Sequence, residues 1–210
     1  MMLSNKQITK ESYEATADEF AHNVSHLAPM ESIKEFISLL PSNPEILDLG
    51  CGSGRDAKIF SEMGANVLGI DFCSNMINIA RRHAPLARFE IMDIEEMNLP
   101  ESHYDGIWST CSLGHIAKNE FQNVMDTVYS LLKNGGYFYL ALKKGQGESL
   151  EQDRRYDGNH KKFWSYFEED EIKQFLTMSN FDIIDFSVVE KNSSYQTHSA
   201  FRIYCRKMIY

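Results

Sequence analysis

A short apolar run, three alternate glycines and a helical pattern follow one another in Glu45-Ile46-Leu47-Asp48-Leu49-Gly50-Cys51-Gly52-Ser53-Gly54-Arg55-Asp56. The apolar run, 46–49, predicts a buried strand. The glycines allow a sharp turn and a close approach to a ligand, because they lack Cβ and tolerate positive φ. A helix beginning near Arg55 would direct its free N–H groups into the same turn. Strand, turn and helix start together predict a cradle for a nucleotide-like ligand.

Apolar runs and helical patterns alternate on both sides of this stretch. Strands are predicted over 46–49, 66–71, 89–93, 104–110 and 137–142, and helices over 55–63, 74–83 and 118–132. Ser74 is the expected N-cap of the second of these helices. This alternation implies right-handed βαβ units and an α/β fold, a doubly wound, mostly parallel, Rossmann-like sheet with helices on both faces. Near-continuous apolar strands fit a sheet buried on both sides.

Two more strands, 182–190 and 200–208, alternate apolar and polar residues around Asn192-Ser193-Ser194. They predict a C-terminal antiparallel hairpin that brings the sheet to seven strands. Helices are also predicted over 9–27, 29–40 and 168–178.

The sequence therefore predicts one domain, 1–210, in four parts. Helices in 1–43 cover the ligand site, 44–143 is the ligand-binding core, and 168–210 closes the sheet. The polar segment 144–167 is too long for an ordinary connection, which predicts a functional loop or a mobile lid that recognises a second substrate.

Composition limits the partners. The 210 residues carry a formal net charge of -9, and this acidity disfavours nucleic acid as a partner. No apolar run approaches the roughly 20 residues needed to span a bilayer, and the first residues lack the apolar core of a signal peptide. The four cysteines show no close paired spacing, which argues against a metal site and a disulfide framework and favours a cytoplasmic protein.

Three predicted strands end in an acid, namely Asp48, Asp71 and Asp93. Asp71 lies about 20 residues beyond the glycine turn, where an acid can accept hydrogen bonds from ribose hydroxyls. Phe72 would then line an adenine pocket, and Asp93 would accept from the adenine amino group. One such acid could simply cap a helix, but three in register with the turn are harder to explain in that way.

The ligand is expected to be cationic and free of phosphate. The spacing Gly50-x-Gly52-x-Gly54 differs from the dinucleotide pattern, and Asp48 would repel a diphosphate. S-adenosylmethionine carries a sulfonium and an amino group, so its charge suits this acidic rim.

The sequence resembles the class I S-adenosylmethionine-dependent methyltransferases. The resemblance rests on 46–54, 67–77, 92–94, 104–109 and 131–136. Three further segments, 54–57, 112–116 and 143–148, resemble a small bacterial branch related to tellurite-resistance methyltransferases. The resemblance implies that the glycines approach the methionine part, that Asp48 lies near its amino group, and that a tyrosine caps this end. The implied cofactor site comprises Tyr13, Asp48, Gly50, Gly52, Gly54, Arg55, Asp71, Phe72, Met76, Asp93, Ile94, Ser109, Thr110 and Cys111.

Methyl transfer does not require a general base unless the acceptor must lose a proton. His115 is the candidate base because it follows the fourth strand on the ligand side; a structural hydrogen bond is the alternative. Arg155 and Trp164 are candidates for acceptor binding, and Gly114, where the family often has a larger residue, would widen the acceptor pocket.

The favoured function is methyl transfer to an oxygen, nitrogen or sulfur atom of a small molecule. One alternative keeps the chemistry but changes the acceptor to RNA or a protein side chain. Another is a nicotinamide-dependent oxidoreductase or a non-catalytic nucleotide-binding module, which the turn spacing and Asp48 disfavour. The sequence leaves the oligomeric state open.

Overall fold

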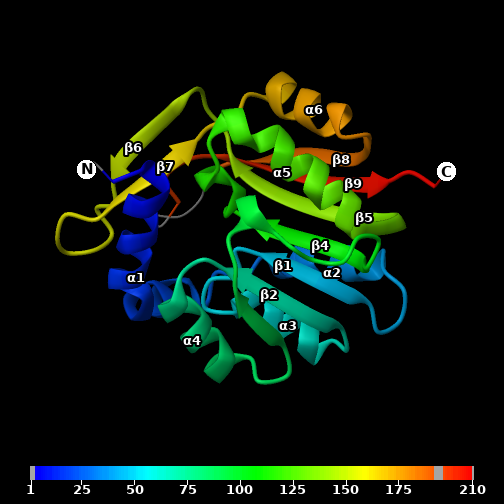
Figure 1. Cartoon of the computed structure of the whole chain (residues 1–210), viewed down its shortest axis with the longest axis horizontal. Helices are drawn as coiled ribbons and strands as arrows, with labels where there is room; N and C mark the ends of the chain where they lie inside the picture. The colour runs from blue at the N-terminus through cyan, green and yellow to red at the C-terminus, as the bar shows by residue number, and fades with distance from the viewer. Residues whose placement is uncertain (1–2, 192–195, 210) are drawn as a thin grey trace.

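A seven-stranded sheet forms the centre of the structure, a computed structural model that describes residues 3–191 and 196–209 (Figure 1). Its order is β3-β2-β1-β4-β5-β9-β8. The strands are β1 (Glu45–Leu49), β2 (Asn66–Asp71), β3 (Arg88–Ile91), β4 (Tyr104–Thr110), β5 (Leu132–Lys143), β8 (Phe181–Val189) and β9 (Ala200–Lys207). Strands β1 to β5 pair in parallel, whereas β9 is antiparallel to both β5 and β8. The predicted fold class is confirmed.

Helices cover both faces of the sheet. The helices α5 (Lys118–Leu131) and α6 (Glu169–Met178) pack on one face, and α2 (Met30–Ser38), α3 (Arg55–Glu62) and α4 (Ser74–His83) on the other. Leu47 and Leu49 belong to the first core, whereas Ile46 belongs to the second. Successive residues of β1 therefore enter opposite cores, which explains why the strand is apolar at Ile46, Leu47 and Leu49.

The N-terminus of α4 differs from the sequence prediction. Cys73 rather than Ser74 is the N-cap residue, and no side chain of its own caps the helix. The carboxylate of Glu14 does so instead, because it accepts hydrogen bonds from the backbone N–H groups of Ser74 (2.7 Å) and Asn75 (2.9 Å). Glu14 lies on α1 (Asn5–Val24), so the cap also joins α1 to the sheet domain.

Strand β5 begins earlier than predicted. Leu132 already pairs with Tyr104, and the register shifts before Gly106. The turn expected at 134–136 therefore lies within an irregular strand. The predicted hairpin turn at 192–194 falls outside the described residues.

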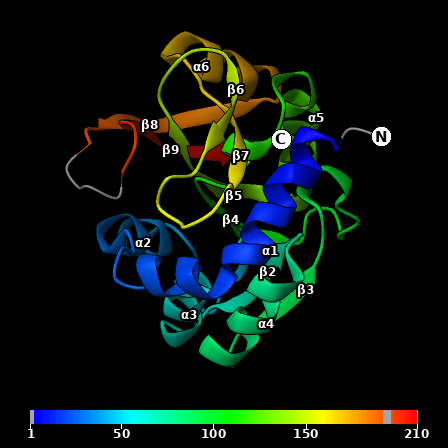
Figure 2. The same ribbon diagram turned by 90° about the vertical axis from the view of Figure 1, so that its left-hand side faces the viewer.

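The segment 144–167 contains a β-hairpin, which was not predicted from the sequence. Strands β6 (Glu148–Gln152) and β7 (Lys161–Ser165) form a separate antiparallel sheet. The alternating pattern of a strand could not be recognised in β6 because its residues are mostly polar, whereas β7 buries Phe163 and Trp164. The backbone N–H of Phe163 donates to Thr9 Oγ1 of α1 (2.9 Å). Figure 2 shows α1 and this hairpin lying across one end of the large sheet.

Two short 3-10 turns, η1 (Ile94–Glu96) and η2 (Leu113–His115), follow β3 and β4. Within the described residues, no helix combines the length and the apolar character needed to cross a bilayer.

Candidate functional site

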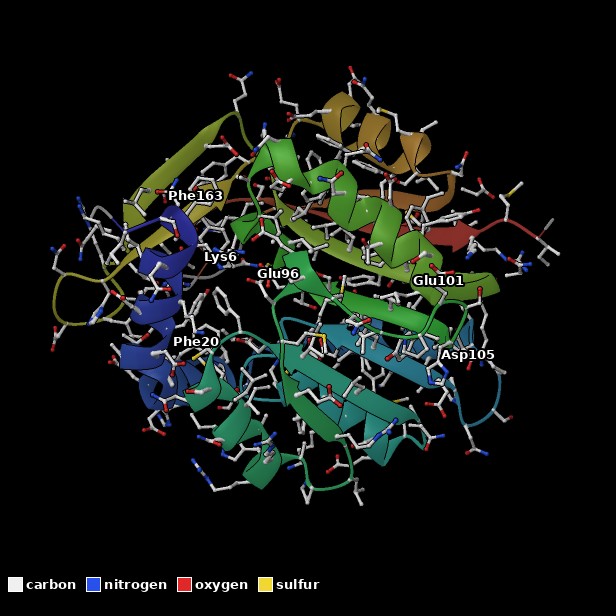
Figure 3. All side chains as sticks on the ribbon, viewed as in Figure 1. Lys6, Phe20, Glu96, Glu101, Asp105 and Phe163 are labelled. Atoms are coloured by element: carbon white, nitrogen blue, oxygen red, sulfur yellow. The ribbon has the colours of Figure 1, made fainter. Side chains whose placement is uncertain are left out.

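A cavity of about 780 Å³ lies where α1 and the β6–β7 hairpin cover the carboxyl ends of the parallel strands. Figure 3 places Lys6, Phe20 and Phe163 at this end of the molecule and Glu101 and Asp105 at the other. Most of the predicted site residues line the cavity: Tyr13, Asp48, Gly50, Gly52, Arg55, Asp71, Phe72, Met76, Asp93, Ile94, Thr110, Cys111, His115, Arg155 and Trp164. Gly54 and Ser109 are not part of its wall.

The glycines of the turn have different surroundings. Gly52 (φ +52°) borders the cavity. Apart from its chain neighbours, Phe20, at 3.6 Å, is the only one of the described residues that would lie within 4 Å of a Cβ placed on it. Gly54 (φ +78°) instead packs inward, since its Cβ would lie 3.0 Å from Ala80 and 3.1 Å from Phe89. Gly52 thus leaves room for a ligand, and Gly54 allows close packing of the helix behind it.

Asp71 fastens the glycine turn to the end of β2. Its two carboxylate oxygens accept from the backbone N–H groups of Gly52 (3.0 Å) and Cys73 (2.9 Å). Burial raises the pKa of Asp71 to about 6, against the effect of these hydrogen bonds. Each oxygen keeps a free lone pair, so a ligand hydroxyl can still donate to this carboxylate.

Asp48 has an unpartnered oxygen at the cavity wall. The residue is 3% exposed, and its Oδ2 has no hydrogen-bond partner among the described residues. Burial, together with the nearby Asp56 carboxylate, raises the pKa of Asp48 well above its usual range. A buried carboxylate oxygen without a donor is costly, and a cationic ligand group would satisfy it.

Asp93 lies at the other side of the acidic rim, after β3. Its Oδ2 lies 2.8 Å from the Lys6 ammonium of α1, and its Oδ1 accepts from the backbone N–H of Glu95 (3.0 Å). Phe72 and Ile94 line the same part of the cavity. Lys6 therefore binds the same carboxylate that the sequence predicts to accept from the adenine amino group.

Arg55 is held by its neighbour. Its guanidinium makes two hydrogen bonds to the Asp56 carboxylate, at 2.7 and 2.9 Å. Asp56 also accepts from the Trp108 indole (3.0 Å) and the Thr110 hydroxyl (3.2 Å). The charge of Arg55 is thus compensated within the wall.

The floor of the cavity follows β4. Cys111 has a φ of +62°, unusual for a residue with a side chain, and its N–H donates to the Ala141 carbonyl of β5 (2.9 Å). Burial raises the pKa of the Cys111 thiol, so the thiol is neutral at pH 7. Ser109 lies beneath this surface, fully buried, with its hydroxyl 2.8 Å from that of Ser112.

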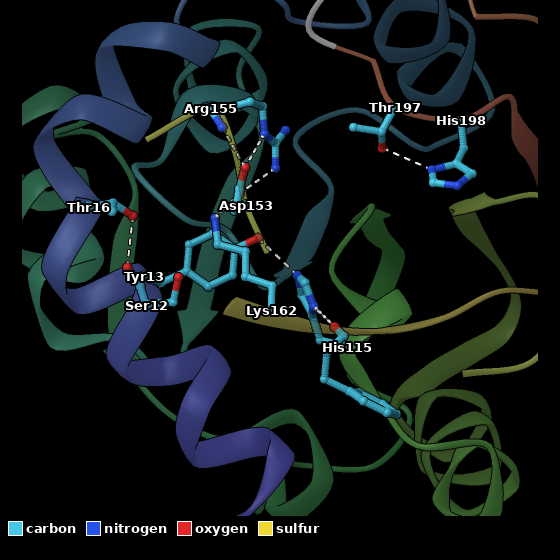
Figure 4. A network of polar contacts seen from close by, with 10 residues as sticks. Ser12, Tyr13, Thr16, His115, Asp153, Arg155, Lys162, Thr197 and His198 are labelled. Atoms are coloured by element: carbon cyan, nitrogen blue, oxygen red, sulfur yellow. Dashed lines mark hydrogen bonds and ion pairs between the residues drawn. The ribbon is translucent and has the colours of Figure 1, made fainter. Parts of the chain in front are cut away.

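Both ring nitrogens of His115 are engaged (Figure 4). Nδ1 lies 2.7 Å from the Phe163 carbonyl, which can only accept, so Nδ1 carries the proton and Nε2 accepts from the Tyr13 hydroxyl (2.9 Å). Burial, aided by the positive charge of Lys162, lowers the pKa of His115 to about 3. A group with this pKa is a weak base at neutral pH, which weighs against the predicted general-base role.

The two predicted acceptor-binding residues come from the hairpin segment. Arg155 already makes a bidentate contact with Asp153, 2.7 Å at each nitrogen, and Asp153 also binds the buried Lys162 at 2.9 Å (Figure 4). Trp164 packs against Gly114, where a Cβ would lie 3.2 Å from its ring. The expectation that Gly114 widens the acceptor pocket was therefore wrong, because Trp164 fills that space.

Lys143 was missed as a site residue. It ends β5 and lines the cavity with its ammonium 3.3 Å from the centre of the Trp164 ring. The rule that selected the acids would also have found it, because its side chain follows a parallel strand at the same edge of the sheet.

Comparisons with known proteins agree with this geometry. Residues 46–136 match the family model described as a methyltransferase domain. The phosphoethanolamine N-methyltransferase of Plasmodium falciparum is 26% identical over 188 residues, which cover 87% of this chain and 64% of that protein. The chain spans less than two thirds of the length of the first curated relatives it matches.

Solved structures share the fold. An S-adenosylmethionine-dependent methyltransferase of Methanosarcina mazei superposes with a TM-score of 0.75 at 24% identity, over 87% of this chain and 99% of its own. The 1,6-didemethyltoxoflavin-N1-methyltransferase of Burkholderia thailandensis, solved with bound 1,6-didemethyltoxoflavin and S-adenosylhomocysteine, superposes with a TM-score of 0.76 at 19% identity, over 99% of this chain and 92% of its own.

The sheet and the site at its edge define a class I methyltransferase fold. The match of residues 46–136 to the methyltransferase domain model confirms the resemblance seen in the sequence.

Proposed function

We propose that this chain transfers a methyl group from S-adenosylmethionine to an oxygen, nitrogen or sulfur atom of a small molecule. The observation that carries the proposal is the unpartnered Oδ2 of Asp48 beside the open face of Gly52, in a cavity of a methyltransferase domain. The cofactor's ammonium would donate a hydrogen bond to Oδ2 of Asp48 and bring a positive charge to this carboxylate. The absent Cβ of Gly52 leaves room for the methionine part.

The remaining cavity residues fit the other parts of this cofactor. The free lone pairs of Asp71 can accept from the ribose hydroxyls. Phe72, Asp93 and Ile94 would hold the adenine, and Met76 extends the apolar side of that wall. Tyr13 covers the site from α1, and Thr110 and Cys111 form the floor under the reacting sulfur.

When bound, S-adenosylmethionine supplies the electrophilic methyl group. The residues of this chain orient the two reactants and keep water out, which is the main contribution that such a transfer requires. His115 positions the Tyr13 hydroxyl through its Nε2 rather than abstracting a proton. In this proposal the domain has no obligatory general base.

Calorimetry with S-adenosylhomocysteine tests the cofactor, and transfer of labelled methyl groups into a metabolite extract tests the acceptor class. We expect binding and label in small molecules. Absence of binding at millimolar concentration, or tight NAD binding instead, would refute the cofactor. Label in total RNA or protein, without label in the extract, would refute the small-molecule acceptor.

A further inference from the structure

Charge is divided across the carboxyl edge of the sheet. Asp48, Asp71 and Asp93 lie at or near the ends of β1, β2 and β3, which lie on one side of β4. On the other side, Lys143 ends β5, and Arg202 lies near the start of the antiparallel β9. All five residues line the cavity. The acidic half of the cavity suits the cationic cofactor. The basic half, beyond the floor formed by β4, is therefore the space that the cofactor leaves open.

Lys143 is a cavity-lining cation without an ion-pair partner among the described residues. Its side chain is partly buried, and among the described residues no carboxylate lies within ion-pair distance of its ammonium and no group hydrogen-bonds to it. The Trp164 ring, 3.3 Å from the ammonium, supplies a cation–π contact. Burial lowers the pKa of Lys143 to about 8. Removing an ammonium group from water is costly unless a partner compensates the charge, so this site favours an anion.

The nearest acids are already committed to other groups. Glu151 accepts from the hydroxyls of Ser149 and Tyr166, at 2.7 Å each. Asp153 is shared by two cations, Arg155 and Lys162. Neither carboxylate is therefore left over to pair with the Lys143 ammonium.

We propose that Lys143 binds an anionic group, a carboxylate or a phosphate, of the methyl acceptor. The inference rests on the proposed methyl-transfer function and names the class of acceptor. The anion supplies the partner that Lys143 lacks, and Trp164 fixes the position of the ammonium. An anion here also offsets the repulsion between Lys143 and the cationic cofactor.

The test uses the complex with S-adenosylhomocysteine, so that the cofactor's own carboxylate site is filled. Ligand-observed NMR measures the binding of benzoate, phenyl phosphate and benzamide, the last a neutral match for benzoate. We expect at least one acid to bind roughly 10- to 100-fold more tightly than benzamide, as for a charged hydrogen bond. Whichever of benzoate and phenyl phosphate binds more tightly indicates whether the anionic group of the acceptor is a carboxylate or a phosphate.

Variants test whether the preference for an acid over benzamide depends on Lys143. Lys143→Gln should abolish it and Lys143→Arg should keep it. Lys144→Gln removes the next, exposed lysine and should leave it unchanged. Three results would overturn the inference: benzamide bound as well as both acids by the unmodified protein, neither acid bound at millimolar concentration, or a preference retained in Lys143→Gln. Failure of S-adenosylhomocysteine itself to bind would instead overturn the proposed function.

Discussion

Gly52→Ala should weaken cofactor binding far more than it weakens the fold. The new Cβ would meet only Phe20, at an ordinary 3.6 Å, so the folded protein can accommodate it. The left-handed φ of +52° remains a cost, about 1–2 kcal/mol for a residue with a Cβ. For a chain of this size we expect a fall in Tm of about 2–8 °C.

Gly147→Ala is the matched control for this cost. Gly147 has a φ of +74°, and none of the described residues would lie within 4 Å of its Cβ, so the substitution introduces the backbone strain alone. Its Tm should fall by about as much as that of Gly52→Ala, with S-adenosylhomocysteine binding unchanged. In Gly52→Ala the methyl group enters the cavity, and an overpacking cost of about 1–3 kcal/mol raises Kd by about 5- to 150-fold.

Differential scanning fluorimetry and calorimetry provide the two readouts. Gly54→Ala completes the series, because its Cβ would lie 3.0 Å from Ala80 and should cost more stability than either other variant. Equal affinity of Gly52→Ala and Gly147→Ala for S-adenosylhomocysteine would refute the assignment of Gly52 to the ligand. A Tm of Gly52→Ala as low as that of Gly54→Ala would show that its Cβ meets protein instead.

Three further predictions concern the polar groups of the cavity. Asp48→Asn should weaken S-adenosylhomocysteine binding at least about tenfold without lowering Tm, because it removes a buried carboxylate whose Oδ2 has no hydrogen-bond partner among the described residues; calorimetry and fluorimetry together check this. As the pH falls below about 6, Asp71 takes up a proton and accepts the ribose hydroxyls less well, so the affinity should fall by up to about tenfold per pH unit. Calorimetry at pH 5 and 7 tests this, and the part due to Asp71 should vanish in Asp71→Asn. Tyr13→Phe leaves Nε2 of His115 without a donor and should cost about 1–3 kcal/mol of stability; an unchanged Tm would contradict the assigned tautomer.

The parallel core and its acids could be predicted from the sequence because both follow local patterns. Each strand is largely an apolar run between turn signals, and each acid lies at or near the end of its strand. Parallel strands bring their carboxyl ends to one edge, so Asp48, Asp71 and Asp93 meet without further information.

The contacts between α1 and the rest of the site could not be predicted in the same way. Glu14 caps a helix that begins 60 residues later, and Tyr13 donates to His115 across 102 residues. Neither pair leaves a periodic signal. The hairpin was missed because β6 is polar and half-exposed, so its alternation carries little hydrophobic contrast.

The topology explains why cofactor and acceptor meet at one place. The chain builds β1, β2 and β3 toward one side, then crosses to β4 and β5 on the other side of β1. The connections next to β1 therefore leave on opposite faces, and a crevice opens between the ends of β1 and β4. Gly52 lies on one side of this crevice and Lys143 beyond the other. Substitutions at the two positions should for this reason be separable: Gly52→Ala changes the affinity for S-adenosylhomocysteine, whereas Lys143→Gln changes the choice between acid and amide once that cofactor product is bound.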